Sequence, residues 1–206
     1  MLNPMWKLPI RGMHHLAGSA GALTFVGGAG DLNETGQIRS PDDLDRQIAG
    51  AISNLESALE IESCSLDDVV RIKAFYLSDG TANEWQVKAA IANEFKENPL
   101  PVISTLPVPL QPFSHQKVQI QAIAQRNWRT ERGVRTATSL IPEVERSRFS
   151  VNELTDGLRA NEFIAIANRT AADINDVVSN PSDGPAQTHS IMQSIENTLA
   201  KLGASF

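Results

Sequence analysis

Histidine and cysteine, which often carry nucleophilic or metal chemistry, are scarce in this sequence and form no catalytic pattern. The 206 residues contain four histidines and one cysteine. His14 and His15 precede the first predicted strand, where neighbouring side chains point to opposite faces, so the pair is not expected to share a metal ion. A place for His15 at the entrance of a ligand pocket stays open. Cys64 has no nearby histidine or basic residue to favour its thiolate form, which indicates an unreactive cysteine.

Two other chemical patterns have ordinary structural explanations. Asp42, Asp43 and Asp45 come at the start of a predicted helix, where acidic residues interact favourably with the helix dipole, so a metal site is not expected. The run from Gly27 to Gly30 is similar to a phosphate-binding loop. It precedes a predicted turn and hairpin rather than a helix, which argues against a nucleotide site. We therefore predict no metal and no cofactor.

The elements that must position any site follow from hydrophobic periodicity. Apolar residues at steps of three and four predict helices over about 42–62 and 83–97, the second ended by Pro99 and Pro101. Short apolar or alternating runs predict strands over 23–26, 69–77, 102–106 and 118–124. Glycines after residue 26 predict a tight bend and a hairpin there. Three prolines between residues 107 and 112 indicate an edge or a loop.

This element order predicts an α+β domain. Two helices alternate with groups of strands, so we expect a mixed β-sheet with both helices packed on one face. The predicted domain spans residues 1–126. Because its helices cover only one face of the sheet, the other face is expected to be covered in an oligomer.

Composition and charge exclude several classes of protein. Hydrophobic residues make up 41% and charged residues 20% of the chain, as in globular proteins. The formal net charge of −6 argues against a nucleic-acid partner. No apolar run reaches the length of about 18 residues that a membrane span needs, and the N-terminus has no apolar core of a signal peptide. The single cysteine favours a cytoplasmic location.

An arginine-rich segment follows the first domain. Residues 127–148 and the residue before them hold a third of all lysines and arginines, as Arg126, Arg129, Arg132, Arg135, Arg146 and Arg148. A solvated linker is the simplest interpretation. An anion or RNA site and a contact with an acidic partner remain alternatives.

Residues 149–206 are similar to the first half of the first domain. Residues 163–167 are comparable with residues 25–29. A separate comparison adds the same number to every residue number of the first domain; we call this number the repeat offset. It aligns Gln47 with Gln187 and Leu55 with Ile195. The segment predicts a strand over about 162–167 and a helix over about 185–202. The equivalents of the later strands and of the second helix are missing. A partner chain could supply them; alternatively the chain is a fragment, or the segment is an appendage on the first domain.

Several short motifs, taken in order, resemble the RidA/YjgF family of reactive-intermediate (enamine/imine) deaminases. They cover about residues 14–126, and half a copy follows at 149–206. The motifs are LTFVGG (23–28), NETG (33–36), Gln47, NL (54–55), DDVVR (67–71), FYLSD (75–79), LP (100–101) and VQIQAIA (118–124). The resemblance implies a chorismate-mutase-like fold that forms trimers or pseudo-trimers with ligand pockets between neighbouring subunits.

The resemblance also implies which residues form the pocket. The arginine that pairs with the substrate carboxylate in deaminating members is replaced by Ile103, and an alkyl group cannot make that contact. The family's glutamate in the last strand aligns with Gln121, which can orient a water molecule as the catalytic candidate. The helix asparagine near the pocket aligns with Lys88. The family's carboxylate-binding backbone turn is retained at Gly27 and Gly28. The substrate-binding candidates are therefore Gly27, Gly28, Lys88, Ile103, Ser104 and His15.

Two functional hypotheses follow. The first is a divergent enzyme that deaminates or hydrolyses a small enamine, imine or related metabolite with water, in a pocket that another chain could complete. The second is a non-catalytic subunit that binds a small ligand or supports a catalytic partner. Both predict a homo- or hetero-oligomer. The sequence does not identify the substrate.

Overall fold

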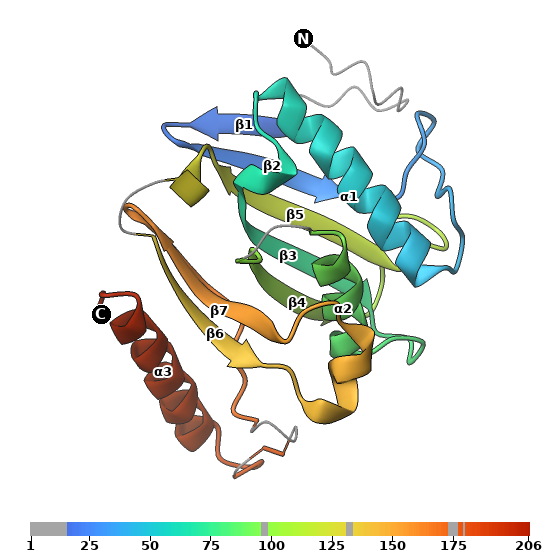
Figure 1. Cartoon of the computed structure of the whole chain (residues 1–206). Coiled ribbons are helices and arrows are strands. Elements are labelled where there is room, and N and C mark those ends of the chain that lie inside the picture. Colours follow the sequence, from blue (N-terminus) through green and yellow to red (C-terminus); the bar gives the residue numbers. More distant parts are fainter. Residues whose placement is uncertain (1–15, 96–98, 131–133, 173–176, 179) are drawn as a thin grey trace.

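The computed structural model describes residues 16–95, 99–130, 134–172, 177–178 and 180–206. Two β-sheets form its framework, and two helices cover one face of the larger sheet (Figure 1). This arrangement confirms the predicted α+β class with a mixed sheet and helices on one face. None of the helices in the described part of the chain is long and apolar enough to cross a membrane.

The larger sheet has five strands in the order β1-β2-β5-β3-β4. All neighbours are antiparallel except β3 and β4, which are parallel. The strands are β1 (Ala17–Ala20), β2 (Leu23–Ala29), β3 (Val69–Leu77), β4 (Val102–Val108) and β5 (Val118–Gln125). Inward-facing side chains of β3 alternate along the strand, as the sequence pattern predicts.

Two strands continue further than the sequence indicates. The expected bend after Val26 is instead a bulge, where the register between β2 and β5 shifts across Gly27 and Gly28 and pairing resumes at Ala29. Strand β4 continues through Pro107 to Val108. Since β4 is the last strand of its sheet, Pro107 needs no backbone donor on the outer side and the pairing with β3 tolerates it.

The two helices of the first domain have clear local signals. Helix α1 (Leu44–Ile61) starts after Asp43, whose side chain accepts a hydrogen bond from the Arg46 amide. Its buried face includes Ile48, Leu55 and Leu59, which have no exposed surface. Helix α2 (Glu84–Asn93) starts with a reciprocal capping box and ends before residue 97, the predicted end; residues 96–98 lie outside the described part.

A second, three-stranded sheet has the order β6-β7-β8. Its strands are β6 (Arg135–Leu140), β7 (Glu153–Ala160) and β8 (Phe163–Ile166), followed by helix α3 (Gly184–Lys201). Strands β6 and β7 are not predicted from the sequence, and β6 lies inside the range 127–148. One face of this sheet packs on the larger sheet through a core that includes Trp128 and Leu158, both without exposed surface.

The β7–β8 hairpin, one isolated bridge and α3 correspond to elements of the first domain at the repeat offset. Ala20 pairs with Leu23 in the first hairpin, and Ala160 pairs with Phe163 in the other. The isolated bridge between Leu32 and Ile38 corresponds to that between Ala172 and Val178. The helix-capping residues Asp43 and Asp183 are related by the same offset. The sequence comparison of residues 163–167 with residues 25–29 is therefore wrong by two positions, because the strand pairing places Phe163 at the position of Leu23.

Candidate functional site

Four of the predicted site residues divide between two cavities, and Gly28 and Ser104 line neither. Gly27 and Gln121 line one on the face of the larger sheet opposite α1 and α2, which we call the sheet-face cavity. Lys88 and Ile103 line another between β4, α2 and the second sheet, which we call the junction cavity. His15 lies outside the described residues. Within one chain, the site residues that the resemblance implies therefore do not form a single pocket.

Strand geometry explains the division. Ile103 is opposite Ile72 on β3, and Ile72 is opposite Ala122 on β5, so these three side chains share the helix-covered face. Gln121 precedes Ala122 and therefore points to the other face. Ile103 is 4% exposed and belongs to the helix-side core.

The sheet-face cavity has a volume of about 290 Å³ and lies across β2, β3 and β5. It combines an apolar floor with two cations. Lys73 lies 4.8 Å from the centre of the Phe75 ring, and Nε of Arg71 is buried without a hydrogen-bond partner. Gln121 is opposite Lys73 in the strand register. The cavity can therefore attract an anionic or aromatic group, and a large side chain in its lining, Phe25, is 44% exposed.

Gly27 and Gly28, beside this cavity, have structural roles. The amide of Gly27 donates a hydrogen bond of 2.9 Å to the carbonyl oxygen of Leu16, next to the β1–β2 hairpin. A Cβ at Gly28 would lie 2.4 Å from the side chain of Gln119. A side chain at residue 28 would therefore displace Gln119.

The junction cavity has a volume of about 130 Å³. The first domain contributes the wall formed by Trp85, Lys88, Pro101 and Ile103. The second sheet and the segment after it contribute the opposite wall, formed by Ser139, Leu154, Thr155, Asp156, Ala167, Asn168 and Arg169. The cavity thus has apolar side chains on both walls and charged groups on both.

Two residues that line the junction cavity, Arg169 and Asp156, form an ion pair. Nη1 of Arg169 lies 3.2 Å from Oδ1 of Asp156, which also accepts a hydrogen bond of 2.9 Å from the Ser139 hydroxyl. Nη2 of Arg169 donates to the Thr198 hydroxyl at 3.0 Å. Nε of Arg169 is buried and has no hydrogen-bond partner. A guanidinium with an unused donor can bind a carboxylate.

The other cation of the junction cavity comes from α2. Lys88 pairs with Glu84 one turn earlier and lies 5.0 Å from the centre of the Trp85 ring. Its side chain is 14% exposed, against 16% for Arg169. Two cations and one carboxylate, Asp156, therefore face a small and largely enclosed space.

Asn168 holds the two walls together. Its backbone amide donates to the Ser104 hydroxyl at 3.1 Å, and its side chain exchanges two hydrogen bonds with the backbone of Thr105 at 3.2 and 3.4 Å. Ser104, a predicted substrate-binding residue, therefore lies at the junction but its hydroxyl accepts the Asn168 amide.

Sequence reasoning misses three residues of this site, Asp156, Asn168 and Arg169. The signal that finds them is the repeat offset, at which they correspond to Leu16, Gly28 and Ala29. Polar residues thus stand at three positions where the first domain has apolar residues or glycine. The misalignment by two positions conceals this contrast.

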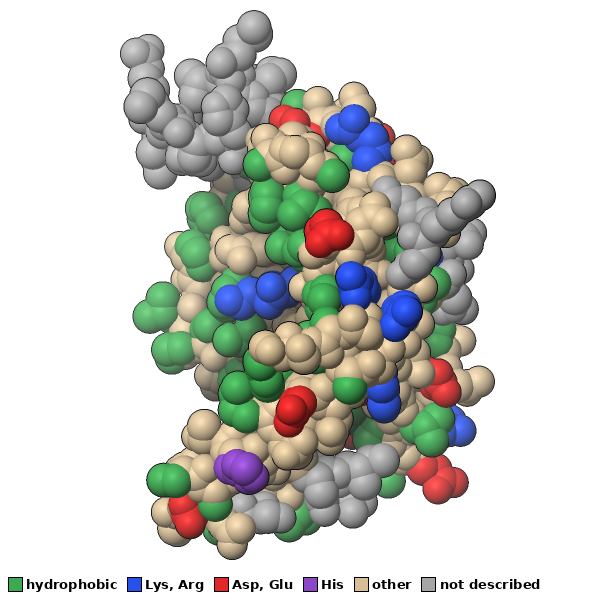
Figure 2. Space-filling view, turned by 90° about the vertical axis from the view of Figure 1, so that its left-hand side faces the viewer, with side chains coloured by type: hydrophobic (Ala, Val, Ile, Leu, Met, Phe, Trp, Pro, Cys, Tyr) green, Lys and Arg blue, Asp and Glu red, His purple; other side chains and the backbone are tan. Residues whose placement is uncertain are grey.

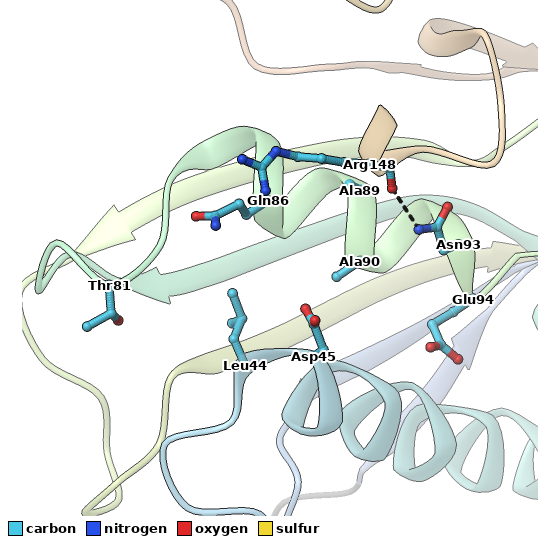
Figure 3. A pocket seen from close by; sticks show the side chains of 9 residues that line it. All are labelled: Leu44, Asp45, Thr81, Gln86, Ala89, Ala90, Asn93, Glu94 and Arg148. Carbon is cyan, nitrogen blue, oxygen red and sulfur yellow. Dashed lines mark hydrogen bonds between the residues drawn. The ribbon is translucent and has the colours of Figure 1, made fainter. Parts of the chain in front are cut away.

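A larger cavity of about 480 Å³ lies between α1, α2 and the 3₁₀ helix Glu143–Arg148. Figure 3 shows the side chains that line it, with Asn93 donating to the carbonyl oxygen of Arg148 at 3.0 Å. None of the predicted site residues in the described part of the chain lines it. Among the residues that the structure describes, no group of three or more histidine, cysteine or acidic residues is arranged to hold a metal ion.

Comparison with known proteins gives one family match. The family model described as endoribonuclease L-PSP matches residues 10–126. No curated protein sequence matches the chain.

Solved structures share the fold of the first domain. YyfA from Yersinia pestis, a protein of unknown function in the conserved Rid family, is 24% identical with a TM-score of 0.50; the match covers 56% of this chain and 90% of YyfA. The yeast protein YEO7 is 19% identical with a TM-score of 0.50; the match covers 60% of this chain and 97% of YEO7. At these identities the likeness concerns the fold alone.

Proposed function

Because this chain belongs to the endoribonuclease L-PSP (RidA/YjgF) family, we propose that it binds a small carboxylate-bearing imine or enamine in the junction cavity and hydrolyses it with water. One observation carries the proposal. The first domain has Ile103 at the position of the family's arginine. Arg169 presents a guanidinium from the opposite wall of the same cavity.

The size and chemistry of the cavity define the substrate class. A cavity of about 150 Å³ admits a molecule of about six heavy atoms, and the junction cavity is close to that size at about 130 Å³. The carboxylate of such a molecule would pair with the guanidinium of Arg169, with Lys88 adding positive charge. Trp85, Ile103 and Leu154 would contact a short alkyl group.

Asp156 is the proposed proton acceptor. Water adds to the carbon of the C=N bond while the Asp156 carboxylate takes one of its protons and passes it to the nitrogen, which gives a carbinolamine. Asp156 then takes the hydroxyl proton of the carbinolamine and passes it to the nitrogen while the C–N bond breaks, the C=O bond forms and ammonia leaves. The products are a 2-keto acid and ammonia, so the atoms balance without a cofactor. The ion pair with Arg169 and the hydrogen bond from Ser139 fix the orientation of Asp156.

The second candidate is a non-catalytic subunit that binds a small carboxylate or supports a catalytic partner. The observation in its favour is the separation of Gln121 from Ile103 on opposite faces of the sheet. Gln121, Gly27 and Gly28 would act in catalysis only if another chain covered the sheet-face cavity. The exposed Phe25 supports such a contact, and we propose a trimer or pseudo-trimer in the cytoplasm.

Turnover of 2-iminobutyrate by the full chain tests both candidates, with 2-ketobutyrate and ammonia as the measured products. We expect slow turnover that Arg169→Leu lowers about 10- to 100-fold in kcat/KM, the effect of losing a charge-assisted hydrogen bond of about 1.5–3 kcal/mol. Arg46→Leu is the matched control, since its side chain is 80% exposed on α1.

Each outcome separates the candidates. Binding of 2-ketobutyrate by the unmodified chain, lost in Arg169→Leu and without imine hydrolysis, would establish the non-catalytic candidate. Equal turnover in the Arg169→Leu and Arg46→Leu variants would show that the junction cavity is not the site. Light scattering that gives a monomer at all concentrations would contradict the proposed oligomer.

A further inference from the structure

The surface formed by β8 and α3 differs from its counterpart in the first domain. Strand β2 pairs with β1 on one side and with β5 on the other, whereas β8, among the described residues, pairs only with β7. The strand register of the two hairpins is the same at the repeat offset. The free edge of β8 therefore corresponds to the edge of β2 that β5 occupies.

The apolar stripe of α3 is also incompletely covered. On α1 the corresponding side chains are buried by β5, β2 and α2: Ala51, Leu55 and Leu59 have no exposed surface and Ile52 is 3% exposed. Helix α3 packs mainly on β6 and β7. Its equivalent residues Ile191, Ile195 and Leu199 are only partly buried, and Met192 is 43% exposed. On the side of the molecule that carries α3, hydrophobic side chains lie exposed among polar and basic ones (Figure 2).

The first domain shows what covers such a surface. Strand β5 pairs with β2 from Leu23 opposite Gln125 to Ala29 opposite Ile120. Its alternate residues Ile120, Ala122 and Ala124 are at most 4% exposed, and α1 lies against the strand. The same polypeptide segment that ends in β5 also supplies α2, which contacts α1.

We propose that the free edge of β8 and the apolar stripe of α3 bind a partner protein through a segment of the order strand–helix–strand–strand, whose last strand adds antiparallel to β8. The partner is recognised by backbone hydrogen bonds to β8 and by alternating apolar side chains against Ile191, Ile195 and Leu199. This inference concerns a different surface from the junction cavity and does not depend on the proposed reaction.

A second copy of the chain does not fit this surface in the same way. Its β5 is already paired on both sides, with β2 and β3. It could offer only its own β8 edge. A partner with an unpaired strand of the β5 type satisfies both the edge and the helix stripe.

The test adds such a segment to the full chain. Residues 66–126 are appended after Ser205, because Ser205 corresponds to Ser65 at the repeat offset, and they stand in for the partner. In the unmodified chain we expect α3 amides to exchange with deuterium about 100-fold faster than α1 amides, as weakly packed elements do. In the extended chain we expect α3 exchange to slow about 10-fold or more.

The matched control carries Ile120→Asp and Ala124→Asp in the appended copy only, and we expect it to leave α3 exchange fast. Ile195→Asp in the extended chain should likewise abolish the added protection while the urea midpoint of the first domain stays unchanged. The proposal is overturned if α3 is as protected as α1 in the unmodified chain. It is also overturned if the control segment protects α3 equally, or if cross-linking joins β8 to β8 of a second copy.

Discussion

Residues 16–64 and residues 156–204 share their order of elements but differ in packing. Both regions contain a hairpin, an isolated bridge and an 18-residue helix capped by aspartate. Both hairpin turns need a positive φ, at Gly21 (61°) in one and at Asn161 (53°) in the other. The comparison teaches that local signals suffice to form these elements, whereas burial depends on the strands that follow in the chain.

Several side chains of the second region are more polar than their counterparts in the better-packed first region. Ile48 and Ala58 of α1 correspond to Thr188 and Thr198 of α3. Three polar replacements, Asp156, Asn168 and Arg169, lie where the second region meets the first. The second region therefore shares the hairpin and the capped helix of the first, while its rim carries the charged groups of the candidate site.

The largest expected effect separates the two helices directly. Leu55→Ala removes a side chain with no exposed surface and should lower the free energy of unfolding by about 2–5 kcal/mol. Ile195→Ala, at the equivalent partly buried position, should cost less than about 1 kcal/mol. Urea denaturation followed by circular dichroism measures both. Equal losses would contradict the difference in packing.

The contact of α3 with its sheet gives the next effect. A Cβ at Gly157 would lie 2.7 Å from Thr198 and 3.0 Å from Leu202, whereas the first region has Ala17 at this position. Gly157→Ala should therefore weaken α3 packing by about 1–3 kcal/mol, measured as faster amide exchange in α3. Gly18→Ala is the control, since a Cβ there meets nothing within 4 Å. Unchanged α3 exchange would show that the helix shifts without cost.

The aspartates that cap α1 and α3 give a third test of how the two regions differ. The Asp43 side chain accepts from the Arg46 amide at 3.1 Å, and that of Asp183 accepts from the Ala186 amide at 2.9 Å. Alanine at either residue should cost about 0.5–2 kcal/mol of helix stability. We expect Asp43→Ala to lower the urea midpoint of the whole first domain and Asp183→Ala to change only α3 exchange. A lowered urea midpoint in both variants would mean that the regions unfold together.

The smallest expected effect is the loss of stability at low pH that follows from protonation of Asp79. A hydrogen bond from Lys117 at 2.7 Å, with others from Thr81, holds the pKa of Asp79 well below its usual value of 3.8. A lowered pKa stabilises the fold above the usual value, and that contribution is lost as the pH falls below it. In urea titrations between pH 2 and 6, the stability difference between the unmodified chain and Asp79→Asn should shrink toward low pH. A constant difference would contradict the role of the charge. Asp79 has no counterpart in residues 156–204, so α3 exchange should not follow this change.

The sequence predicts elements wherever a local pattern determines them. The apolar stripes locate α1 and α3 within two residues at each end. Strand β7 is missed because its sequence, ELTDGLRA, lacks strict alternation and contains Gly157. Its burial comes from contacts on both sides of the second sheet, which no local pattern contains.

The site is predicted only in part for the same reason. Lys88 and Ile103 line the same cavity, because α2 covers β4. Gln121 lies on the other face, so the residues taken from the resemblance do not line one cavity within the described part of this chain. Arg169 enters the cavity from a region far from Lys88 in sequence, and hydrophobic periodicity, which is read in windows of about 11–18 residues, carries no information on so distant a contact.

The hydrogen bonds of Asn168 to Ser104 and Thr105 bear on how the junction cavity behaves when the protein is diluted. They join the two walls of the junction cavity within one polypeptide. The second wall is thus present at the high effective concentration of a tethered module, of the order of millimolar for short linkers. The cavity should therefore remain assembled at nanomolar protein, where pockets shared between separate subunits dissociate, and its ligand affinity should not change as the protein is diluted.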